Sequence, residues 1–353
     1  MRILVCYPGH VISTVDVARG WESALRRLGH EVYQFAYEWH VPFYGAVLDA
    51  WSEWNPDFKF RLKDALMLSS QDLVCKAIDL MPIDLCVIIC GLLVHERGYE
   101  QLKKIGVPTC VIFTESPYND HLLEYILPRV DMMFVNDRNS VEPLRALNRN
   151  VFYMPHSYDP ERHHPPNGAE QGLGDPSYQH QVFFMGALYE ERRALFQALE
   201  EIDLGMDVGL DIYTTSMDRR GRVTGGMQND ELVRHYWGSE IVLSPNRTTR
   251  DYFERTQITE PAYSLGPRVY EVAACRTFQL TDPSRPELED VFGQTIPVYR
   301  NAEELAEQIR YYTERPVERE ARAAEARERV APCTFENRAR EIFTPMIGEV
   351  FGG

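Results

Sequence analysis

Short runs of apolar and β-branched residues alternate with amphipathic segments along most of the chain. The run over 85–90 is apolar at every position, which is typical of a parallel strand buried on both faces. Gly29 and Gly106 mark joints at which an amphipathic segment gives way to an apolar one. This alternation predicts βαβ units in an open parallel sheet. In the first half it predicts strands over 2–6, 31–36, 85–90, 108–113, 132–135 and 151–154, and helices over 15–28, 63–80 and 99–105.

The alternation stops between residues 157 and 180, in a segment rich in proline and glycine, and then restarts. The second half predicts strands over 181–185, 210–213, 240–243 and 277–280, and helices over 190–200, 230–237, 267–275, 302–313 and 316–330. The chain is therefore expected to fold as two α/β domains in tandem. The predicted boundaries are 1–160 for the first domain, 161–180 for a linker, 181–334 for the second domain and 335–353 for a C-terminal helix.

A stretch rich in Trp, Tyr and Phe, residues 33–60, has little periodicity, and no element is predicted across 40–60. Two interpretations are open. The aromatic side chains either pack as core or as a lid, or they offer stacking surfaces to a sugar or an aromatic acceptor.

Composition narrows the choice of partners. The 353 residues carry a formal net charge of −16, which disfavours a nucleic-acid partner and adhesion to an anionic membrane, although a local basic patch stays compatible with this sum. No apolar run approaches the roughly 18 residues of a membrane span, and the apolar N-terminal run is expected to be a buried strand rather than a signal. The seven cysteines form no CxxC pair, so we expect reduced thiols and a cytoplasmic location.

The loops after the strands are the first place to seek chemistry, because ligands of open α/β sheets bind beyond the carboxyl ends of the strands. In the first half these loops and the helix turn beside them carry three candidate general bases, His10, Asp16 and Glu115. Glu115 is the most distinctive because it follows a fully apolar strand. The alternative for Glu115 is hydrogen bonding within its own loop.

The segment over 264–275 holds a candidate anion site. Pro267 suits the first position of a helix, with Gly266 before it, and a helix start attracts anions. Arg268 adds a positive charge, and Glu271 lies three residues on, on the same helical face. A diphosphate at the helix start and a ribose on Glu271 suit this arrangement. An exposed Arg–Glu pair on a surface helix is the alternative.

The same segment, with its Pro-Arg-aromatic-Glu-x-x-Ala-Cys run before an apolar strand, resembles the C-terminal signature of GT-B glycosyltransferases of the CgeB/YkvP-like branch. The run Phe-Phe-Met-Gly over 183–186 and the tail over 329–339 also resemble that branch, so the resemblance covers most of 181–342. It implies an α/β GT-B fold, in which two Rossmann-like domains face each other across a cleft. It also implies a nucleotide-sugar donor on the second domain, the acceptor on the first, and a C-terminal helix that crosses back to the first.

Carried over residue by residue, the resemblance implies that Glu271 holds the donor ribose. It also implies that Gly266, Pro267 and Arg268 face the diphosphate and that Gly186 lets the backbone approach the same phosphates. Tyr213 and Thr214 are then expected near the nucleobase. No metal site is apparent, and the resemblance implies no cofactor and no metal. Arg247 follows the strand over 240–243, and it either helps Arg268 to offset the charge of the leaving diphosphate or is an ordinary surface arginine. One departure is Tyr263, at a position where many retaining relatives carry a glutamate.

We therefore expect a metal-independent glycosyltransferase that uses a nucleotide-diphosphate sugar, with a UDP-sugar favoured and the base left open. The acceptor is an unidentified hydroxyl of a saccharide, small molecule or protein, and net charge disfavours a nucleic acid. Two alternatives stay open. One is a nucleotide-sugar epimerase of the same architecture, which needs no acceptor, and the other is a GT-B-like binding protein without turnover.

Overall fold

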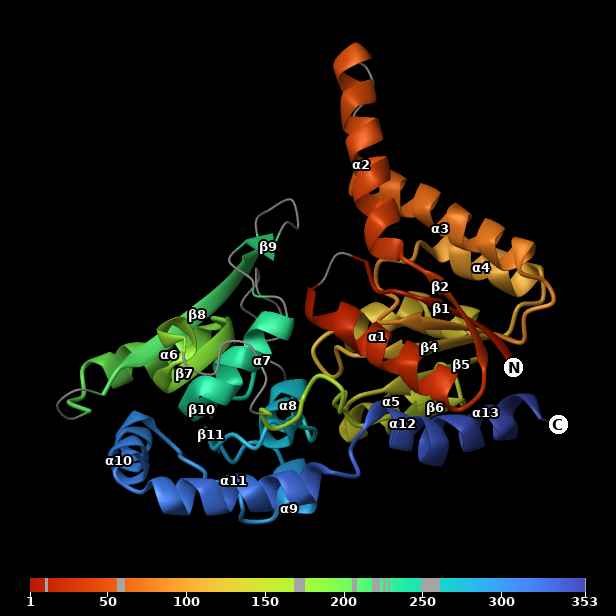
Figure 1. The fold of residues 1–353 in the computed structure, drawn as a ribbon. Helices are drawn as coiled ribbons and strands as arrows, with labels where there is room; N and C mark the ends of the chain where they lie inside the picture. The colour runs from red at the N-terminus through yellow and green to blue at the C-terminus, as the bar shows by residue number, and fades with distance from the viewer. Residues whose placement is uncertain are drawn as a thin grey trace. The chain divides into compact units, whose positions relative to one another are not determined.

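The computed structural model describes the chain except for residues 10–11, 56–60, 168–174, 205–207, 218–222, 225–226, 228, 249–260 and 353. The chain divides into two compact units (Figure 1). The first comprises Met1–Met154 together with Glu336–Gly353, and the second comprises Pro155–Phe335.

The first unit is built on a parallel sheet in the order β2-β1-β3-β4-β5-β6. Its central strands are apolar at every position except Thr109 because helices cover both faces of the sheet, and β3, β4 and β5 are buried throughout. Chain order reverses between β1 and β3, so the topological switch point of this unit lies beyond their carboxyl ends. The strands are β1 (Arg2–Cys6), β2 (Glu31–Phe35), β3 (Leu85–Ile89), β4 (Thr109–Phe113), β5 (Met132–Val135) and β6 (Val151–Tyr153).

The longer helices of the first unit are α1 (Ile12–Arg27), α2 (Tyr37–Trp54), α3 (Leu62–Asp79) and α4 (Glu96–Lys104), with a short α5 (Val141–Arg145). Short 3₁₀ turns, not a regular helix, precede β5. The absence of an element across 40–60 was a wrong prediction, since α2 covers most of that stretch. Pro42 and Gly45 interrupt its pattern, and apolar residues on opposite sides of the helix obscure the 3.6-residue period.

The C-terminal segment packs on the first unit. It consists of α12 (Phe335–Arg338), a π-helical turn (Ala339–Phe343) and α13 (Thr344–Phe351). Phe343 is fully buried, with ring centroids 5.5 Å from Trp21 of α1 and 5.6 Å from Phe134 of β5. The C-terminal segment therefore completes the hydrophobic core of the first unit.

The second unit is built on a sheet in the order β11-β10-β7-β8-β9, parallel except for β9. Helices α6 and α10 cover one face, while α7 and α8 pack on the other. Its switch point lies between β7 and β10. The elements are β7 (His180–Ala187), α6 (Glu190–Glu200), β8 (Leu210–Met217), β9 (Val223–Thr224), α7 (Asn229–Gly238), β10 (Ser239–Ser244), α8 (Pro267–Ala274), β11 (Gln279–Thr281), α9 (Glu287–Phe292), α10 (Ala302–Thr313) and α11 (Pro316–Val330).

These two parallel sheets with helices on both faces confirm the predicted α/β class. Each strand predicted from the alternation is present within a few residues of its expected bounds, and the predicted bounds of α6, α10 and α11 match. The prediction missed α5, β9 and α9, which are five, two and six residues long. Elements this short carry too few residues for a period to show.

Candidate functional site

The switch point of the second unit gathers backbone groups suited to an anion. β7 ends at Ala187 and its neighbour β10 ends at Ser244. Helix α8 begins at Pro267, and Gly266 at its N-cap has extended backbone and makes no side-chain cap. Pro267 has no N–H and the Val269 N–H donates to the Gly266 carbonyl at 3.3 Å, so what this end of α8 offers an anion is chiefly the positive end of the helix dipole.

Arg268 lies in the first turn of α8 and reaches the end of β7. Its Nη2 donates a hydrogen bond to the carbonyl oxygen of Met185, and its guanidinium carbon lies 4.9 Å from the centroid of the Phe184 ring. A Cβ atom on Gly186 would lie 2.5 Å from that Nη2. A side chain at 186 would therefore displace the guanidinium, which is a physical reason for glycine at this position.

A second arginine, Arg192 in the first turn of α6, ties β7 to β10. Its Nη1 donates to the carbonyl of Ala187 at 3.0 Å, and its Nη2 donates to the carbonyl of Pro245 at 2.9 Å. The Tyr189 ring lies beside it, 5.5 Å from the guanidinium carbon of Arg192 and 4.4 Å from that of Arg247. Arg192, Arg247 and Arg268 therefore bring three positive charges to this edge, and we call them the arginine cluster.

A buried hydroxyl accompanies the arginine cluster. Tyr299 is 2% exposed, and its hydroxyl has no hydrogen-bond partner among the described residues. Burial raises the pKa of Tyr299, as does the charge of Asp282, while Arg192 and Arg268 lower it. The hydroxyl therefore stays protonated and lies within the field of two of the three arginines.

Glu271 is half-buried on α8, one turn beyond Arg268. Its charge acts on buried Tyr236, whose pKa is raised by burial and then by Glu271. On β8, Thr214 stands opposite Gly186 in the sheet register. Tyr213 is 38% exposed, and its ring lies 5.5 Å from the ring of His235. These positions, with Gly186 and Arg268, stay predictions as donor contacts.

The three predicted bases have different surroundings in the first unit. His10 lies outside the described residues. Asp16 on α1 pairs with Arg19 at 3.2 Å. Glu115 is half-buried after β4, and the side-chain amide of Asn119 donates to it at 3.5 Å. The contact between Glu115 and Asn119 is of the kind expected from hydrogen bonding within its loop.

The sequence analysis missed a fourth carboxylate, Glu38. It lies in the first turn of α2, just after β2, and its Oε2 is buried without a hydrogen-bond partner among the described residues. Burial raises the pKa of Glu38, and the nearby charge of Arg19 lowers it. Its charge also raises the pKa of Tyr7, which follows β1. Glu38 was overlooked because the stretch that contains it was not predicted as a helix.

Tyr263 stands where many retaining relatives carry a glutamate. Its hydroxyl donates a hydrogen bond to the carboxylate of Asp290 on α9. Among the described residues no group of three His, Cys, Asp or Glu side chains is placed to hold a metal ion. No helix of the described part is both long and apolar enough to cross a membrane.

Two Rossmann-like units, the second with a basic switch point, define the GT-B fold class, which confirms the fold predicted from the sequence. Solved structures with this fold include sucrose-phosphate synthase from Thermosynechococcus elongatus, with a TM-score of 0.63 and 13% identity over 100% of this chain and 99% of that one. An alpha-glucosyltransferase in complex with UDP has a TM-score of 0.59 and 12% identity, over 99% of each chain. A UDP-N-acetylglucosamine 2-epimerase has a TM-score of 0.57 and 10% identity, over 99% of this chain and 96% of that one.

Sequence comparison points to a particular branch of that class. Residues 192–344 match the family described as glycosyl transferase-like. The chain is also 24% identical to spore protein CgeB of Bacillus subtilis, over 67% of this chain and 74% of that protein. The predicted resemblance to GT-B glycosyltransferases of the CgeB-like branch is therefore confirmed.

Proposed function

We propose that this protein is a glycosyltransferase that moves a sugar from a nucleotide-diphosphate sugar to an acceptor hydroxyl. The observation that carries the proposal is the arginine cluster at the switch point of the second unit, beside the N-terminus of α8. UDP is the favoured nucleotide, because a similar structure holds UDP and another is named for a UDP-sugar substrate. The second unit is then the donor unit and the first the acceptor unit.

The arginine cluster suits the departure of a diphosphate. In the proposed reaction the acceptor oxygen bonds to the anomeric carbon, and the bond from that carbon to the diphosphate oxygen breaks. The electron pair stays on the diphosphate, so negative charge builds up on it as it leaves. Fixed positive groups such as Arg192, Arg247 and Arg268 stabilise that charge without reorganising, and the positive end of the α8 dipole adds to them. The proposed reaction therefore needs no bound metal.

The remaining donor contacts follow the prediction from sequence. We propose that Glu271 accepts hydrogen bonds from the ribose hydroxyls, that Gly266 and Pro267 at the start of α8 face the diphosphate, and that Tyr213 and Thr214 on β8 lie near the base. Glu271 is on the same helix as Arg268, one turn away, which suits a ribose and the phosphate attached to it.

The proton of the acceptor hydroxyl goes to a carboxylate of the first unit. Among the candidates we propose Glu38 first, because its Oε2 has no described partner and its raised pKa makes it a better proton acceptor than an ordinary glutamate. Asp16 is paired with Arg19, which weakens it as a base. Glu115 stays a second candidate, and His10 lies outside the described residues. A hydroxyl on a saccharide, small molecule or protein suits the net charge of −16 better than one on a nucleic acid.

An epimerase is the second candidate function, because a UDP-N-acetylglucosamine 2-epimerase shares the fold. A binding protein without turnover is the third, since Tyr263 is engaged with Asp290 where many retaining relatives carry a glutamate. All three share the donor site. The free thiols of the described cysteines, most of them buried, suit the reducing cytoplasm that we propose as the location.

The experiment that separates these functions is incubation with UDP-, GDP-, ADP- and dTDP-sugars, followed by separation of nucleotides and proton NMR of the sugar. A transferase releases nucleoside diphosphate, faster when its acceptor is supplied, and Glu271→Gln slows that release. An epimerase instead changes the sugar configuration with no release. If the protein binds a sugar nucleotide but neither releases the nucleoside diphosphate nor changes the sugar, for every sugar nucleotide and with or without a panel of saccharide acceptors, the transferase proposal is contradicted.

A further inference from the structure

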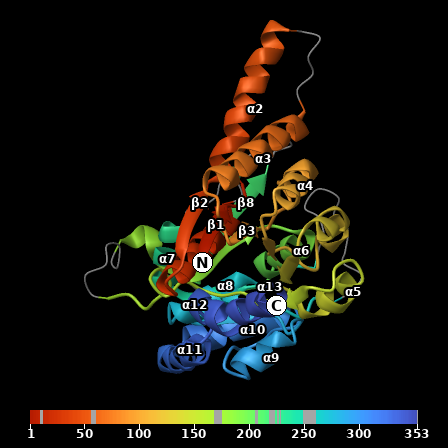
Figure 2. The same cartoon turned by 90° about the vertical axis from the view of Figure 1, so that its right-hand side faces the viewer.

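Helix α2 carries an unusual exposed surface. Five large apolar side chains on it are between 48% and 87% exposed, namely Trp39, Phe43, Val47, Trp51 and Trp54. Their spacing of four, four, four and three residues places them along one side of the helix, and we call this side the α2 aromatic face. Both views show α2 extending away from the sheet of the first unit (Figures 1 and 2). An exposed apolar patch of this extent marks an interaction surface.

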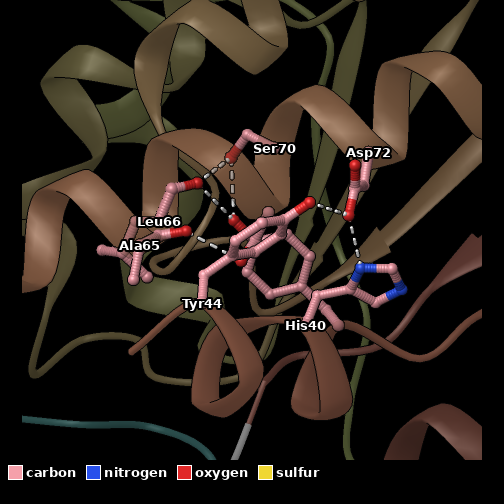
Figure 3. Close-up of polar contacts among 8 residues, drawn as sticks. His40, Tyr44, Ala65, Leu66, Ser70 and Asp72 are labelled. Carbon is pink, nitrogen blue, oxygen red and sulfur yellow. Dashed lines mark hydrogen bonds and ion pairs between the residues drawn. The ribbon is translucent and has the colours of Figure 1, made fainter. Parts of the chain in front are cut away.

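Polar contacts between α2 and α3 fix the rotation of α2 that leaves this face outward. Asp72 of α3 accepts hydrogen bonds from the ring Nδ1 of His40 and the hydroxyl of Tyr44, both at 2.8 Å (Figure 3). One turn earlier, the hydroxyl of Tyr37 lies 2.7 Å from Oγ of Ser70 on α3. Rotating α2 to bury its aromatic face would break all of these contacts. The face therefore needs a partner from outside this helix pair.

The order of residues on the α2 aromatic face is nearly symmetric about Val47. Phe43 and Trp51 lie four residues to either side of it, and Trp39 and Trp54 lie eight and seven residues away. We propose that the partner is a second copy of this chain, whose α2 lies antiparallel across the first. In a two-fold pair each residue i that contacts j is matched by j contacting i. Val47 then faces its own copy, and aromatic rings meet at both ends.

Small side chains at the centre suit this arrangement. Ala50 is exposed three residues beyond Val47, on the same side of the helix, so two α2 helices can approach closely at that point. The larger rings then pack around the crossing, where their size is accommodated as the helices diverge. A face with bulky residues at its centre would hold the two helices apart.

The area is sufficient for such a pair. An aromatic side chain buries roughly 150–250 Å², so the four rings at their observed exposures supply roughly 550 Å² per copy and about 1,100 Å² for the pair. Val47 and Ala50 add to this. A specific interface needs about 1,000 Å². The alternative of an anionic lipid surface is disfavoured, since α2 carries Glu38, Asp49 and Glu53 and neither Lys nor Arg.

Sedimentation velocity over about 1 to 100 μM tests the pair. The parent should sediment as a dimer of the 40.9 kDa chain, and Val47→Glu should shift it to monomer. The matched control is Val317→Glu, which makes the same change at a valine that is 80% exposed on α11 and should leave the dimer intact. Circular dichroism of both variants establishes that they are folded. A parent that stays monomeric, or a Val47→Glu variant that stays dimeric, overturns the proposal.

Cysteine cross-linking tests the antiparallel register. Val47→Cys in a background with exposed Cys75 changed to Ser should form a disulfide-linked dimer on mild oxidation, because residue 47 faces itself across the two-fold axis. Val317→Cys in the same background should not. Failure of Val47→Cys to cross-link overturns this register. Flotation with phosphatidylcholine vesicles that Val47→Glu abolishes would assign the face to a membrane instead.

Discussion

The change of Gly186 to alanine tests whether the arginine cluster is the diphosphate site without altering any charge. The added Cβ would lie 2.5 Å from Nη2 of Arg268 and 3.3 Å from Cζ of Phe184. The guanidinium must move away, because a contact that short is not tolerated, and it then loses its hydrogen bond to the Met185 carbonyl. The backbone at Gly186 has φ of +157°, at the edge of the region that disfavours a side chain.

The expected magnitudes follow from these contacts. The strained backbone and the displaced Arg268 should lower the free energy of unfolding by about 1–3 kcal/mol. A charge-assisted hydrogen bond contributes about 1.5–3 kcal/mol, so loss of the one from Arg268 to a diphosphate should weaken UDP binding roughly 10- to 150-fold. The added methyl group also stands where Gly186 is predicted to approach the phosphates, so a weaker affinity reports on that contact as well as on Arg268.

Isothermal titration calorimetry with UDP, well below the unfolding temperature, measures this loss. The matched control is Gly209→Ala in the same unit, where the nearest neighbour of an added Cβ is the side-chain oxygen of Gln181 at 3.5 Å, an ordinary contact. Gly209→Ala should bind UDP as the parent does. Equal affinity for UDP in the parent and in Gly186→Ala would refute the role given to Arg268.

Three further outcomes are expected. Glu38→Gln should abolish turnover while leaving UDP binding unchanged. The rate of the parent should rise with pH through a pKa above the ordinary glutamate value, and any residual rate of the variant should not show this rise. A parent-like rate in the variant would remove Glu38 from the reaction. The free energy of unfolding in urea should fall as pH drops from about 6.5 towards 4. Burial lowers the pKa of His163 to about 3 and that of His235 to about 4, so these histidines bind protons in the unfolded chain before they do so in the folded one. The same free energy of unfolding at pH 7 and at pH 5 would contradict this. Phe343→Ala should cost roughly 3–5 kcal/mol in urea unfolding, since that ring is fully buried, whereas half-buried Phe351→Ala should cost less.

The sequence predicted the strands well because a parallel strand buried on both faces has a signature that few other structures share. The wholly apolar run that contains β3 is an example. Helix α2 was not predicted because it lacks such a clear pattern. One side of it packs on α3, the other carries the α2 aromatic face, and the two together leave no polar period to detect.

The candidate site divides in the same way. Arg268 and Glu271 were found because both lie on one short helix, where spacing in sequence fixes spacing in space. The roles of Arg192 and Tyr299 depend on where the ends of β7 and β10 meet, which local sequence does not encode. Glu38 was missed for the same kind of reason, since its place beside β1 is known only once α2 is known.

The most direct test of the donor site is a calorimetric comparison of nucleoside diphosphates with the matching monophosphates, in EDTA, for the parent and Arg268→Met. We expect the parent to bind one diphosphate, UDP first among them, at least about tenfold more tightly than its monophosphate. Arg268→Met should remove most of that preference while still binding the nucleoside. No binding of any nucleotide by the parent, or a preference for the diphosphate that Arg268→Met leaves intact, would contradict the account.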